Sequence, residues 1–434
     1  MAWKSIAVWT FAAGIAIARA SFAADPLPMA APESVGMSAE RLARIAPAFR
    51  EHVEKGNLPG AVFLVARHGK LVYADAVGQL DPGKGRPMRP DAIFRIYSMT
   101  KPLVSVGAMM LVEDGRLQLN DPVSKFLPAM KGLKVGVAKI DAEFAKSGYA
   151  MVPADREMTV QDLLRHTAGL AYASLTQNNA VKEAYAKAGI EGDIRPLTPE
   201  EFVDKVAQSP LGHHPGTYWE YSLATDVLGR VVEAASGQRL GDFLQRRLFE
   251  PLGMVDTAFF VAPRNYERIA EALPVDLASN TPNKLYDVST RPSNDSGGAG
   301  GVSTAADYLR FAQMLLNGGQ LDGRRILSRK TVELMSSDHL GTRIQAVSPM
   351  TPGEILLATP GYTFGLGFAV RQASGIAGVA GSQGEFMWGG YAGTYFWIDP
   401  KENLVAVYMT QAPSPIRSYY RKLFKNFVYA AIED

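Results

Sequence analysis

Short apolar runs near the two ends of the chain have the length and turn spacing of β-strands. Residues 60–66 and 71–78 form two such runs on either side of a polar turn, which predicts an antiparallel pair. Near the C-terminus, residues 395–400 and 403–409 predict a second pair, and residues 419–432 predict a terminal helix. Strands are therefore expected at both ends of the chain.

Between these ends, apolar residues recur at the three- and four-residue spacing of helices. Ser38 is placed to cap the first helix, and Thr198 with Glu201 has the spacing of a capping box. Residues 170–197 are polar and show no clear period, and they could line the mouth of a site. The predicted helices cover residues 38–53, 159–166, 223–235, 240–249, 304–316 and 328–335, and another begins at Thr198.

This order of elements predicts an α+β protein with one antiparallel sheet built from both ends of the chain and flanked by terminal helices. We assign residues 24–95 and 300–434 to the sheet region. Residues 96–299 form an inserted, mostly helical region. The cleft between the two regions is the expected place for an active site.

The glycine-rich residues 296–301 allow two interpretations. A phosphate-binding loop would need a Lys-Ser or Lys-Thr pair after the glycines, which is absent, and a preceding strand, which is not clear. We therefore expect a tight turn or a close approach of two backbone segments, which glycine permits.

The first residues have the layout of an export signal. Lys4 supplies a positive charge, residues 6–18 are apolar, and Ser21 and Ala23 offer small side chains to a signal peptidase. We expect residues 1–23 to be a cleavable signal peptide and the protein to be exported, to the periplasm or beyond. An uncleaved membrane anchor is the alternative. No other stretch is apolar and long enough to cross a bilayer, so we expect no stable membrane insertion after cleavage.

Composition narrows the chemistry further. The 434 residues are 47% hydrophobic, enough for a large core, and the net charge of +2 gives no electrostatic case for nucleic acid. Cysteine is absent, which excludes disulfides, thiolate metal sites and a cysteine nucleophile. No metal is expected, because metal-ligand spacing is missing among the histidines, which are His52, His68, His166, His213, His214 and His339.

The central chemical pattern is Ser98-x-x-Lys101 at the head of an apolar segment, residues 103–112. If Ser98 opens a helix, Lys101 lies one turn later on the same face, and its amino group can reach the hydroxyl. Serine is a weak nucleophile that needs a base, and a lysine can act as one when burial and neighbouring charges lower its pKa. Pro102 fits the first turn of a helix. The pattern alone is short enough to occur by chance. Its position at the head of a buried-type helix is what favours a catalytic role.

Two later stretches could complete a site with Ser98. Tyr221 precedes a predicted helix and could pass protons between a nucleophile and a leaving group, although most tyrosines are ordinary half-buried aromatics. Gly389 and Gly390 let the backbone approach a ligand, and an amide there could bind an oxyanion together with the amide of Ser98. Taken alone, that stretch would be a glycine-rich hairpin loop.

Together these stretches resemble the serine β-lactamase and penicillin-recognising superfamily, and most closely the bacterial carboxylesterases called family VIII. The resemblance runs from about Glu33 to the C-terminus. It includes Tyr97-Ser98-Met99-Thr100-Lys101-Pro102, Leu164-Arg165-His166-Thr167-Ala168-Gly169-Leu170, Trp219-Glu220-Tyr221-Ser222, Phe249-Glu250-Pro251-Leu252-Gly253-Met254 and Trp388-Gly389-Gly390.

The resemblance implies a role for each matching residue. Ser98 would be the acylated nucleophile, Lys101 its base partner and Tyr221 the proton relay. The amides of Ser98 and Tyr391 would form the oxyanion hole, and substrate would lie against Trp388, Gly389 and Gly390. Such enzymes act through acylation and deacylation with no metal and no cofactor. The expected partner is a small-molecule ester, and the oligomeric state stays open.

The chain departs from class C β-lactamases at two positions. Leu223 stands where those enzymes have the asparagine of Tyr-x-Asn, and Trp388 stands where they have the lysine of Lys-Thr-Gly. Loss of polar contacts to a required substrate group can cost orders of magnitude in discrimination. We therefore expect hydrolysis of short-chain neutral esters. The alternatives are a β-lactamase or D-alanyl peptide hydrolase, and a non-catalytic cell-wall binding protein. The Gly-x-Ser-x-Gly pattern is absent, which disfavours an α/β-hydrolase.

Overall fold

The computed structural model describes residues 26–141, 146–276, 278–346 and 361–434. The predicted signal peptide, residues 1–23, lies outside the described residues. The main feature is an eight-stranded antiparallel sheet with the order β12-β13-β14-β15-β16-β1-β2-β3. Its strands are β1 (Gly60–Arg67), β2 (Lys70–Asp81), β3 (Arg86–Pro87), β12 (Tyr362–Phe364), β13 (Ala369–Arg371), β14 (Phe386–Gly389), β15 (Tyr395–Asp399) and β16 (Leu404–Thr410).

The two ends of the chain meet where β16 pairs with β1. The register runs from Ala61 opposite Thr410 to Arg67 opposite Leu404. Every residue of β1, β15 and β16 is buried, which explains why their sequences are continuous apolar runs. The predicted sheet built from both ends of the chain is therefore confirmed. Strands β12 to β14 extend the sheet further. They were not predicted, because they are short and glycine interrupts their apolar runs.

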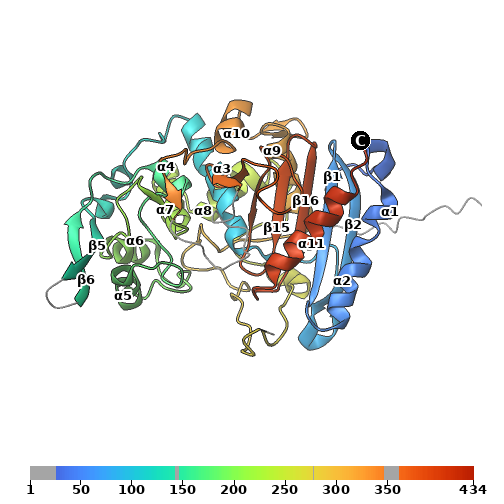
Figure 1. Ribbon diagram of the computed structural model, residues 1–434, viewed down its shortest axis with the longest axis horizontal. Coiled ribbons are helices and arrows are strands. Elements are labelled where there is room, and N and C mark those ends of the chain that lie inside the picture. The colour runs from blue at the N-terminus through green and yellow to red at the C-terminus, as the bar shows by residue number, and fades with distance from the viewer. Residues whose placement is uncertain (1–25, 142–145, 277, 347–360) are drawn as a thin grey trace, which may run out of the picture.

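Helices cover both faces of this sheet (Figure 1). On one face, Phe63 of β1 contacts Phe49 of α2 (Ile45–Glu54) and Phe424 of α11 (Arg417–Ala430), with ring centroids 4.7 and 5.3 Å apart. On the other face, Tyr308 of α9 (Ala305–Leu316) packs on Phe396 of β15 at 4.9 Å. Successive residues of a strand point to opposite faces, so β15 supplies both layers of the core.

In the inserted region, α3 (Thr100–Glu113) packs against α7 (Ala224–Ser236) and α8 (Leu240–Leu244). Residues 100–111 of α3 are all buried, and Figure 1 shows this helix between the sheet and the other helices of the region. Because α3 is apolar on all sides, the helices around it have to cover it fully. The region also contains α4 (Val160–Leu164), α5 (Asn179–Ala188) and α6 (Pro199–Ala207).

Local capping explains where several of these helices begin. The Ser38 side chain accepts from the amide of Arg41 and caps α1 (Ala39–Leu42), but a break at residues 43–44 separates α1 from α2. The helix predicted over residues 38–53 is therefore two helices. Thr198 and Glu201 form the predicted capping box at the start of α6.

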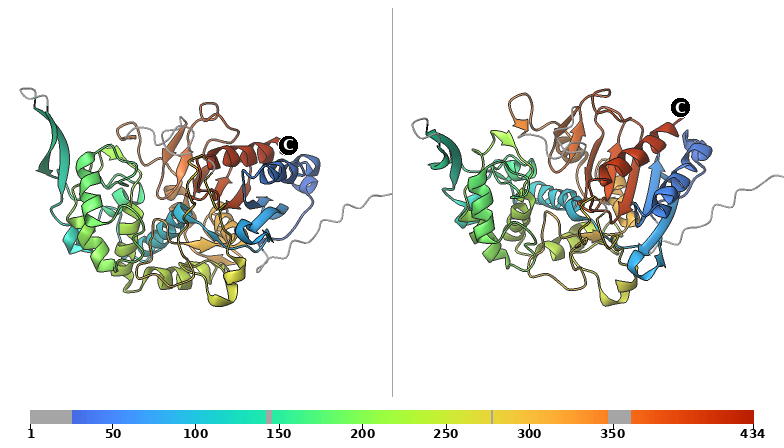
Figure 2. Two further views of the ribbon diagram at one scale, coloured as in Figure 1. Left: turned by 90° about the horizontal axis from the view of Figure 1, so that it is seen from below. Right: turned by 60° about the horizontal axis from the view of Figure 1, so that its bottom comes forward.

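One hairpin inside the helical region was not predicted. Strands β5 (Lys134–Asp141) and β6 (Lys146–Pro153) pair in antiparallel fashion and project from the body in Figure 2. Helix α5 was also not predicted, although Asn178 caps its start and Gly189 ends it in the left-handed conformation. The apolar signal of both elements is small, because Val181 and Tyr185 are the buried residues of α5 and most described residues of the hairpin face solvent.

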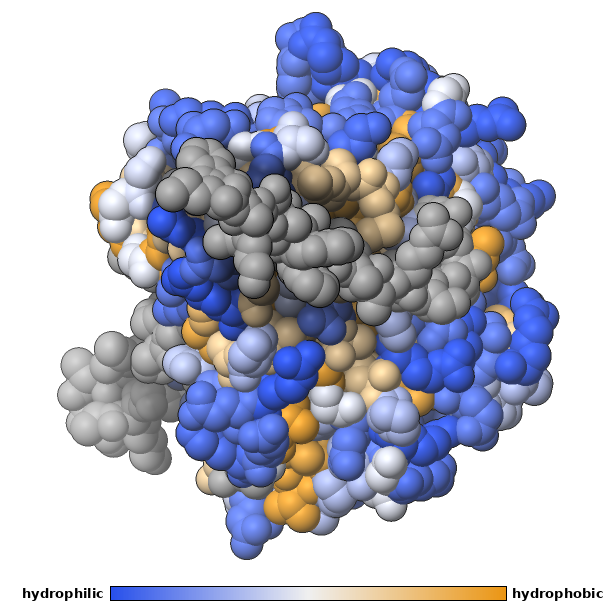
Figure 3. Space-filling model, turned by 90° about the vertical axis from the view of Figure 1, so that its right-hand side faces the viewer, coloured by the Kyte–Doolittle hydropathy of each residue, from blue (hydrophilic) through white to orange (hydrophobic). Residues whose placement is uncertain are grey.

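The surface that carries α1 and α2 is mainly hydrophilic in Figure 3, with scattered apolar residues. This agrees with the amphipathic pattern of α2, whose Ile45, Ala46 and Phe49 are buried. Among the described residues, no helix combines the length and the apolar character that a membrane span requires.

Candidate active site

Ser98 lies in a single 3-10 turn, Tyr97–Met99, that leads directly into α3. The preceding residues Phe94–Arg95 (β4) pair with Val302–Ser303 (β8), which fixes the entry of the chain. Tyr97 has a φ of 43°, in the left-handed region that a bulky residue rarely adopts. Such backbone strain is typical of positions that a functional geometry holds in place.

Lys101 is 1% exposed and lies one turn after Ser98. Its Nζ lies 3.3 Å from Ser98 Oγ, 3.0 Å from the hydroxyl of Tyr172 and 2.8 Å from the carbonyl oxygen of Gly298. Three acceptors match the three donor positions of an ammonium group. The amino group is therefore held in one place beside the serine hydroxyl.

Tyr172 and Gly298 were not predicted as site residues. Tyr172 lies in the polar stretch for which the sequence suggested only a position at the mouth of a site. Gly298 belongs to the glycine cluster, where the predicted close backbone approach is confirmed: a Cβ on Gly297 would lie 2.5 Å from the carbonyl oxygen of Thr225. A carbonyl ligand leaves no trace in residue type, so the sequence could not reveal that of Gly298.

Tyr221 donates its hydroxyl hydrogen to Ser98 Oγ at 2.6 Å. It lies between β7 (Tyr218–Trp219) and α7, and its ring centroid is 4.6 Å from the Nζ of Lys101. Edge-to-face contacts hold the ring, with centroids 5.0 Å from His166 and 5.3 Å from Trp388. The structure thus brings Ser98, Lys101 and Tyr221 into one cluster.

Two neighbours of this cluster stay neutral near pH 7. Burial, and then the charge of Lys101, lowers the pKa of His166 well below its usual value of 6.5. The Nδ1 of His166 lies 3.1 Å from Ser222 Oγ, so the ring is fixed behind Tyr221. Burial raises the pKa of Tyr172 well above its usual value of 10, so this hydroxyl keeps its proton beside Lys101.

The amides of Ser98 and Tyr391 are the predicted oxyanion donors. Within the described ranges, neither amide donates a hydrogen bond to another protein group. Tyr391 lies in a tight turn in which the Gly390 amide donates to the Thr394 carbonyl at 2.8 Å. Thr394 Oγ1 donates to the carbonyl of Ile96 at 3.4 Å and ties this turn to the segment that carries Ser98. Both amides are therefore available as donors to a ligand.

Trp388 is 1% exposed, and its ring packs against Tyr221 and Phe364, with centroids 5.3 Å away in both cases. The ring of Trp388 thus helps to fix the orientation of the Tyr221 ring. Gly389 and Gly390 allow close packing: a Cβ on Gly389 would lie 2.8 Å from the guanidinium carbon of Arg421, which would have to shift. A Cβ on Gly390 would lie 2.2 Å from Thr394 Oγ1.

Three tyrosine rings, those of Tyr97, Tyr286 and Tyr391, gather beside the predicted oxyanion hole. The ring of Tyr97 contacts Tyr286 and Tyr391, with centroids 4.9 and 5.4 Å apart. The side chain of Tyr391 is 52% exposed. The exposed ring of Tyr391 offers flat apolar surface next to the predicted oxyanion hole.

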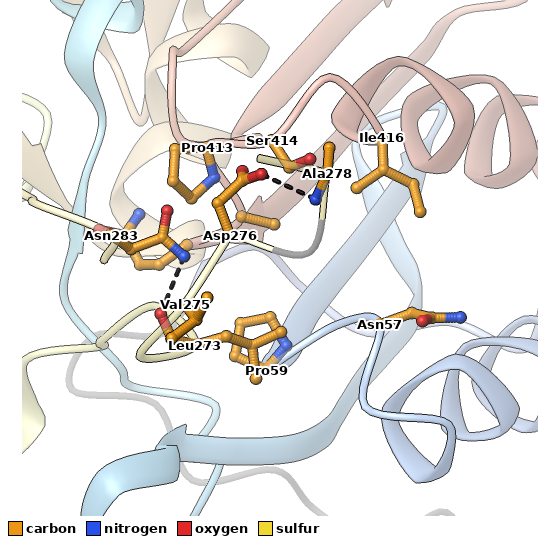
Figure 4. Close-up of a pocket in the computed structure, with 12 residues that line it drawn as sticks. Asn57, Pro59, Leu273, Val275, Asp276, Ala278, Asn283, Pro413, Ser414 and Ile416 are labelled. Carbon is orange, nitrogen blue, oxygen red and sulfur yellow. Dashed lines mark hydrogen bonds between the residues drawn. The ribbon is translucent and has the colours of Figure 1, made fainter. Parts of the chain in front are cut away.

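A separate cavity of about 240 Å³ lies where residues 273–276 and 278–283 face the start of α11 (Figure 4). Its lining is mostly apolar and includes Pro59, Leu273, Val275, Pro413 and Ile416, and none of Ser98, Lys101 and Tyr221 contributes to it. Over the part of the chain that the structure describes, no group of three His, Cys, Asp or Glu residues could hold a metal ion.

Comparison with known proteins agrees with this geometry. The β-lactamase family model matches residues 45–427. Protein Rv1367c of Mycobacterium tuberculosis is 34% identical over 371 residues, with 83% of this chain and 88% of that protein covered. Esterase EstB of Burkholderia gladioli is 31% identical over 395 residues, with 86% and 91% covered. Among solved structures, EstCE1, described as a hydrolase with promiscuous acyltransferase activity, has a TM-score of 0.72 and 27% identity and covers 90% of this chain and 98% of its own.

Proposed function

The chain belongs to the β-lactamase family, and from this premise we propose that it is a serine carboxylesterase that forms an acyl-enzyme on Ser98. The observation that carries the proposal is the cluster around Ser98 Oγ, with Tyr221 OH at 2.6 Å and Lys101 Nζ at 3.3 Å. A nucleophile with a base in hydrogen-bond reach is the arrangement that acyl transfer requires. The similarity to esterase EstB supports the same class of reaction.

In the proposed acylation step, Ser98 Oγ bonds to the ester carbonyl carbon and gives up its proton. Either the phenolate of Tyr221, stabilised by a cationic Lys101, or the neutral amine of Lys101 takes that proton. The carbonyl oxygen becomes an oxyanion that accepts from the amides of Ser98 and Tyr391. Collapse of the intermediate breaks the bond to the alcohol, which leaves with a proton from Tyr221; where Lys101 took the serine proton, Lys101 then returns it to Tyr221. Water then attacks the acyl-enzyme, and the same groups act in reverse.

The surroundings of Tyr221 favour a neutral substrate. Leu223 is 2% exposed and offers no hydrogen bond where β-lactamases have an asparagine. Trp388 brings an aromatic ring, and no positive charge, to the position of their lysine. We therefore propose short-chain neutral esters as substrates and expect β-lactams to react poorly. We also propose that the protein is exported, as residues 1–23 suggest.

A second function, acyl transfer to an alcohol, is favoured by the likeness to EstCE1. An acyl-enzyme on Ser98 can react with any nucleophile that reaches it, so an alcohol can replace water. The measurement is the ratio of new ester to free acid when nitrophenyl butyrate is turned over with increasing amounts of a primary alcohol. Esterase activity alone would give free acid at every alcohol concentration.

The decisive experiment for the main proposal combines labelling with two substrates. Intact-mass analysis after fluorophosphonate treatment should show one adduct, mapped to Ser98, and Ser98→Ala should show none. Nitrophenyl butyrate should turn over much faster than a chromogenic cephalosporin. Faster cephalosporin turnover would make the protein a β-lactamase, and the absence of any adduct would favour a binding protein that keeps the fold.

A further inference from the structure

A buried cation lies beneath the turn that carries the Tyr391 amide. Arg421 of α11 is 5% exposed, and its guanidinium points into the turn formed by residues 390–394. It donates to the carbonyl oxygens of Gly390, Thr394 and Gly393, the last two at 3.1 and 3.4 Å. One charged side chain, that of Arg421, therefore binds three carbonyl oxygens of the turn.

The bond to Gly390 has a particular consequence, because the carbonyl of Gly390 and the N–H of Tyr391 belong to the same peptide unit. A hydrogen bond accepted by the oxygen of a peptide draws electron density from its nitrogen through resonance. The N–H then becomes a stronger donor, and a charged donor has a larger effect than a neutral one. The Gly390 oxygen also accepts from the Gly393 amide at 3.0 Å, which adds to the same polarisation.

The packing around Arg421 leaves little freedom for the guanidinium. A Cβ on Gly389 would lie 2.8 Å from its central carbon, so the glycine lets the strand lie over the guanidinium without displacing it. The guanidinium also lies 5.7 Å from the ring centroid of Tyr395. Burial in a medium of low dielectric constant strengthens the field of this charge on the turn above it.

We propose that Arg421 is a positioning residue for the oxyanion hole, which fixes the turn and polarises the Gly390–Tyr391 peptide so that the Tyr391 amide binds the oxyanion more strongly. This inference rests on the proposed function, because it concerns the same Ser98 site. It extends that function to a residue of the C-terminal helix that does not contact the reacting atoms.

The kinetic test compares Arg421→Gln, which keeps neutral donors, with Arg421→Lys, which keeps a charge. Removing an oxyanion donor lowers kcat about 10²- to 10³-fold. Cooperative polarisation supplies only a fraction of the strength of one hydrogen bond, so Arg421→Gln should lower kcat about three- to tenfold. KM should stay within about twofold, because the effect belongs to the transition state. Arg421→Lys should retain more of the rate.

Arg371 offers a matched control. It is 1% exposed and also donates to backbone carbonyls, those of residues 373, 374, 379 and 380, but these lie outside the site. Arg371→Gln should destabilise the fold without changing the kcat of the folded fraction. If folded Arg421→Gln keeps the normal kcat, or if Arg371→Gln loses as much, the inference is overturned.

A second measurement does not need catalysis. Isotope labelling of tyrosine nitrogen and glycine carbonyl carbon selects the amides of Gly-Tyr pairs, which are Gly148–Tyr149, Gly361–Tyr362 and Gly390–Tyr391. Tyr391→Phe identifies the third signal. In Arg421→Gln that signal should move upfield while the other two stay in place; an unchanged Tyr391 signal would refute the polarisation. A wild-type protein that hydrolyses no ester would refute the proposed function and leave this measurement valid.

Discussion

Tyr221→Phe separates the proton-transfer role of Tyr221 from its packing. The substitution removes the hydroxyl that donates to Ser98 Oγ at 2.6 Å and keeps the ring. The contacts of that ring with His166 and Trp388 are preserved, so the protein should fold. Loss of one neutral hydrogen bond should lower the free energy of unfolding by about 1 kcal/mol.

The expected effect on rate is much larger than this loss of stability. General acid–base groups contribute about 10²- to 10⁴-fold, which corresponds to a rise of about 3 to 5 kcal/mol in the activation barrier. The assay is kcat on nitrophenyl butyrate, together with the rate of fluorophosphonate labelling. Labelling involves attack by Ser98 on a different electrophile. If the labelling rate falls together with kcat, the step that Tyr221 assists is the activation of Ser98 as a nucleophile.

Tyr420→Phe is the matched control. Tyr420 is 0% exposed, and its hydroxyl donates to the carbonyl of Asn57 at 3.4 Å, outside the Ser98 cluster. This variant should show a similar small loss of stability with normal kcat and labelling. A Tyr221→Phe enzyme that keeps kcat within tenfold of the wild type would refute the assigned relay.

Three further predictions concern other groups. Lys101→Met should lower kcat by at least about 10²-fold, because the amino group beside Ser98 is lost, and a near-normal rate would show that the base is elsewhere. Gly390→Ala places a Cβ 2.2 Å from Thr394 Oγ1 and 2.4 Å from the carbonyl of Ile96, so steady-state kinetics should show a fall in kcat of about 10²-fold as the turn moves. Burial raises the pKa of Asp307 from 3.8 to about 6, so its contribution to stability is highest below pH 4 and falls as the pH rises to 6. Asp307→Asn is neutral at every pH, so its free energy of unfolding relative to that of the wild type should rise by about 3 kcal/mol between pH 4 and pH 7, measured by urea unfolding. The same relative free energy at pH 4 and pH 7 would contradict the raised pKa.

Local signals in the sequence predicted the parts of the fold that local physics decides. Ser38 and Thr198 cap helices as expected, because an N-cap depends on a few adjacent residues. The central strands were predictable because both of their faces are buried. The hairpin β5–β6 was not, because Gly136, Lys139 and Gly148 interrupt its short apolar runs.

The same distinction applies to the candidate site. Ser98, Lys101 and Tyr221 could be proposed because their residue types carry the chemistry. Tyr172 could not be distinguished from the polar stretch around it, and Gly298 contributes only a backbone oxygen. Contacts between segments that are distant in the sequence depend on the packed fold, which residue patterns do not encode locally.

Contacts from distant segments also explain how the strained turn at Ser98 is maintained. The Tyr308 hydroxyl donates to the carbonyl of Met99 at 2.9 Å, and the amide of Gly301 donates to Thr100 Oγ1 at 2.9 Å. Thr394 Oγ1 donates to the carbonyl of Ile96 at 3.4 Å. A residue such as Tyr97, with a φ of 43°, keeps its conformation only where the surroundings fix it from several directions. The sheet that joins the two ends of the chain brings these segments together, because Tyr308 packs on Phe396 of β15 and Thr394 directly precedes that strand.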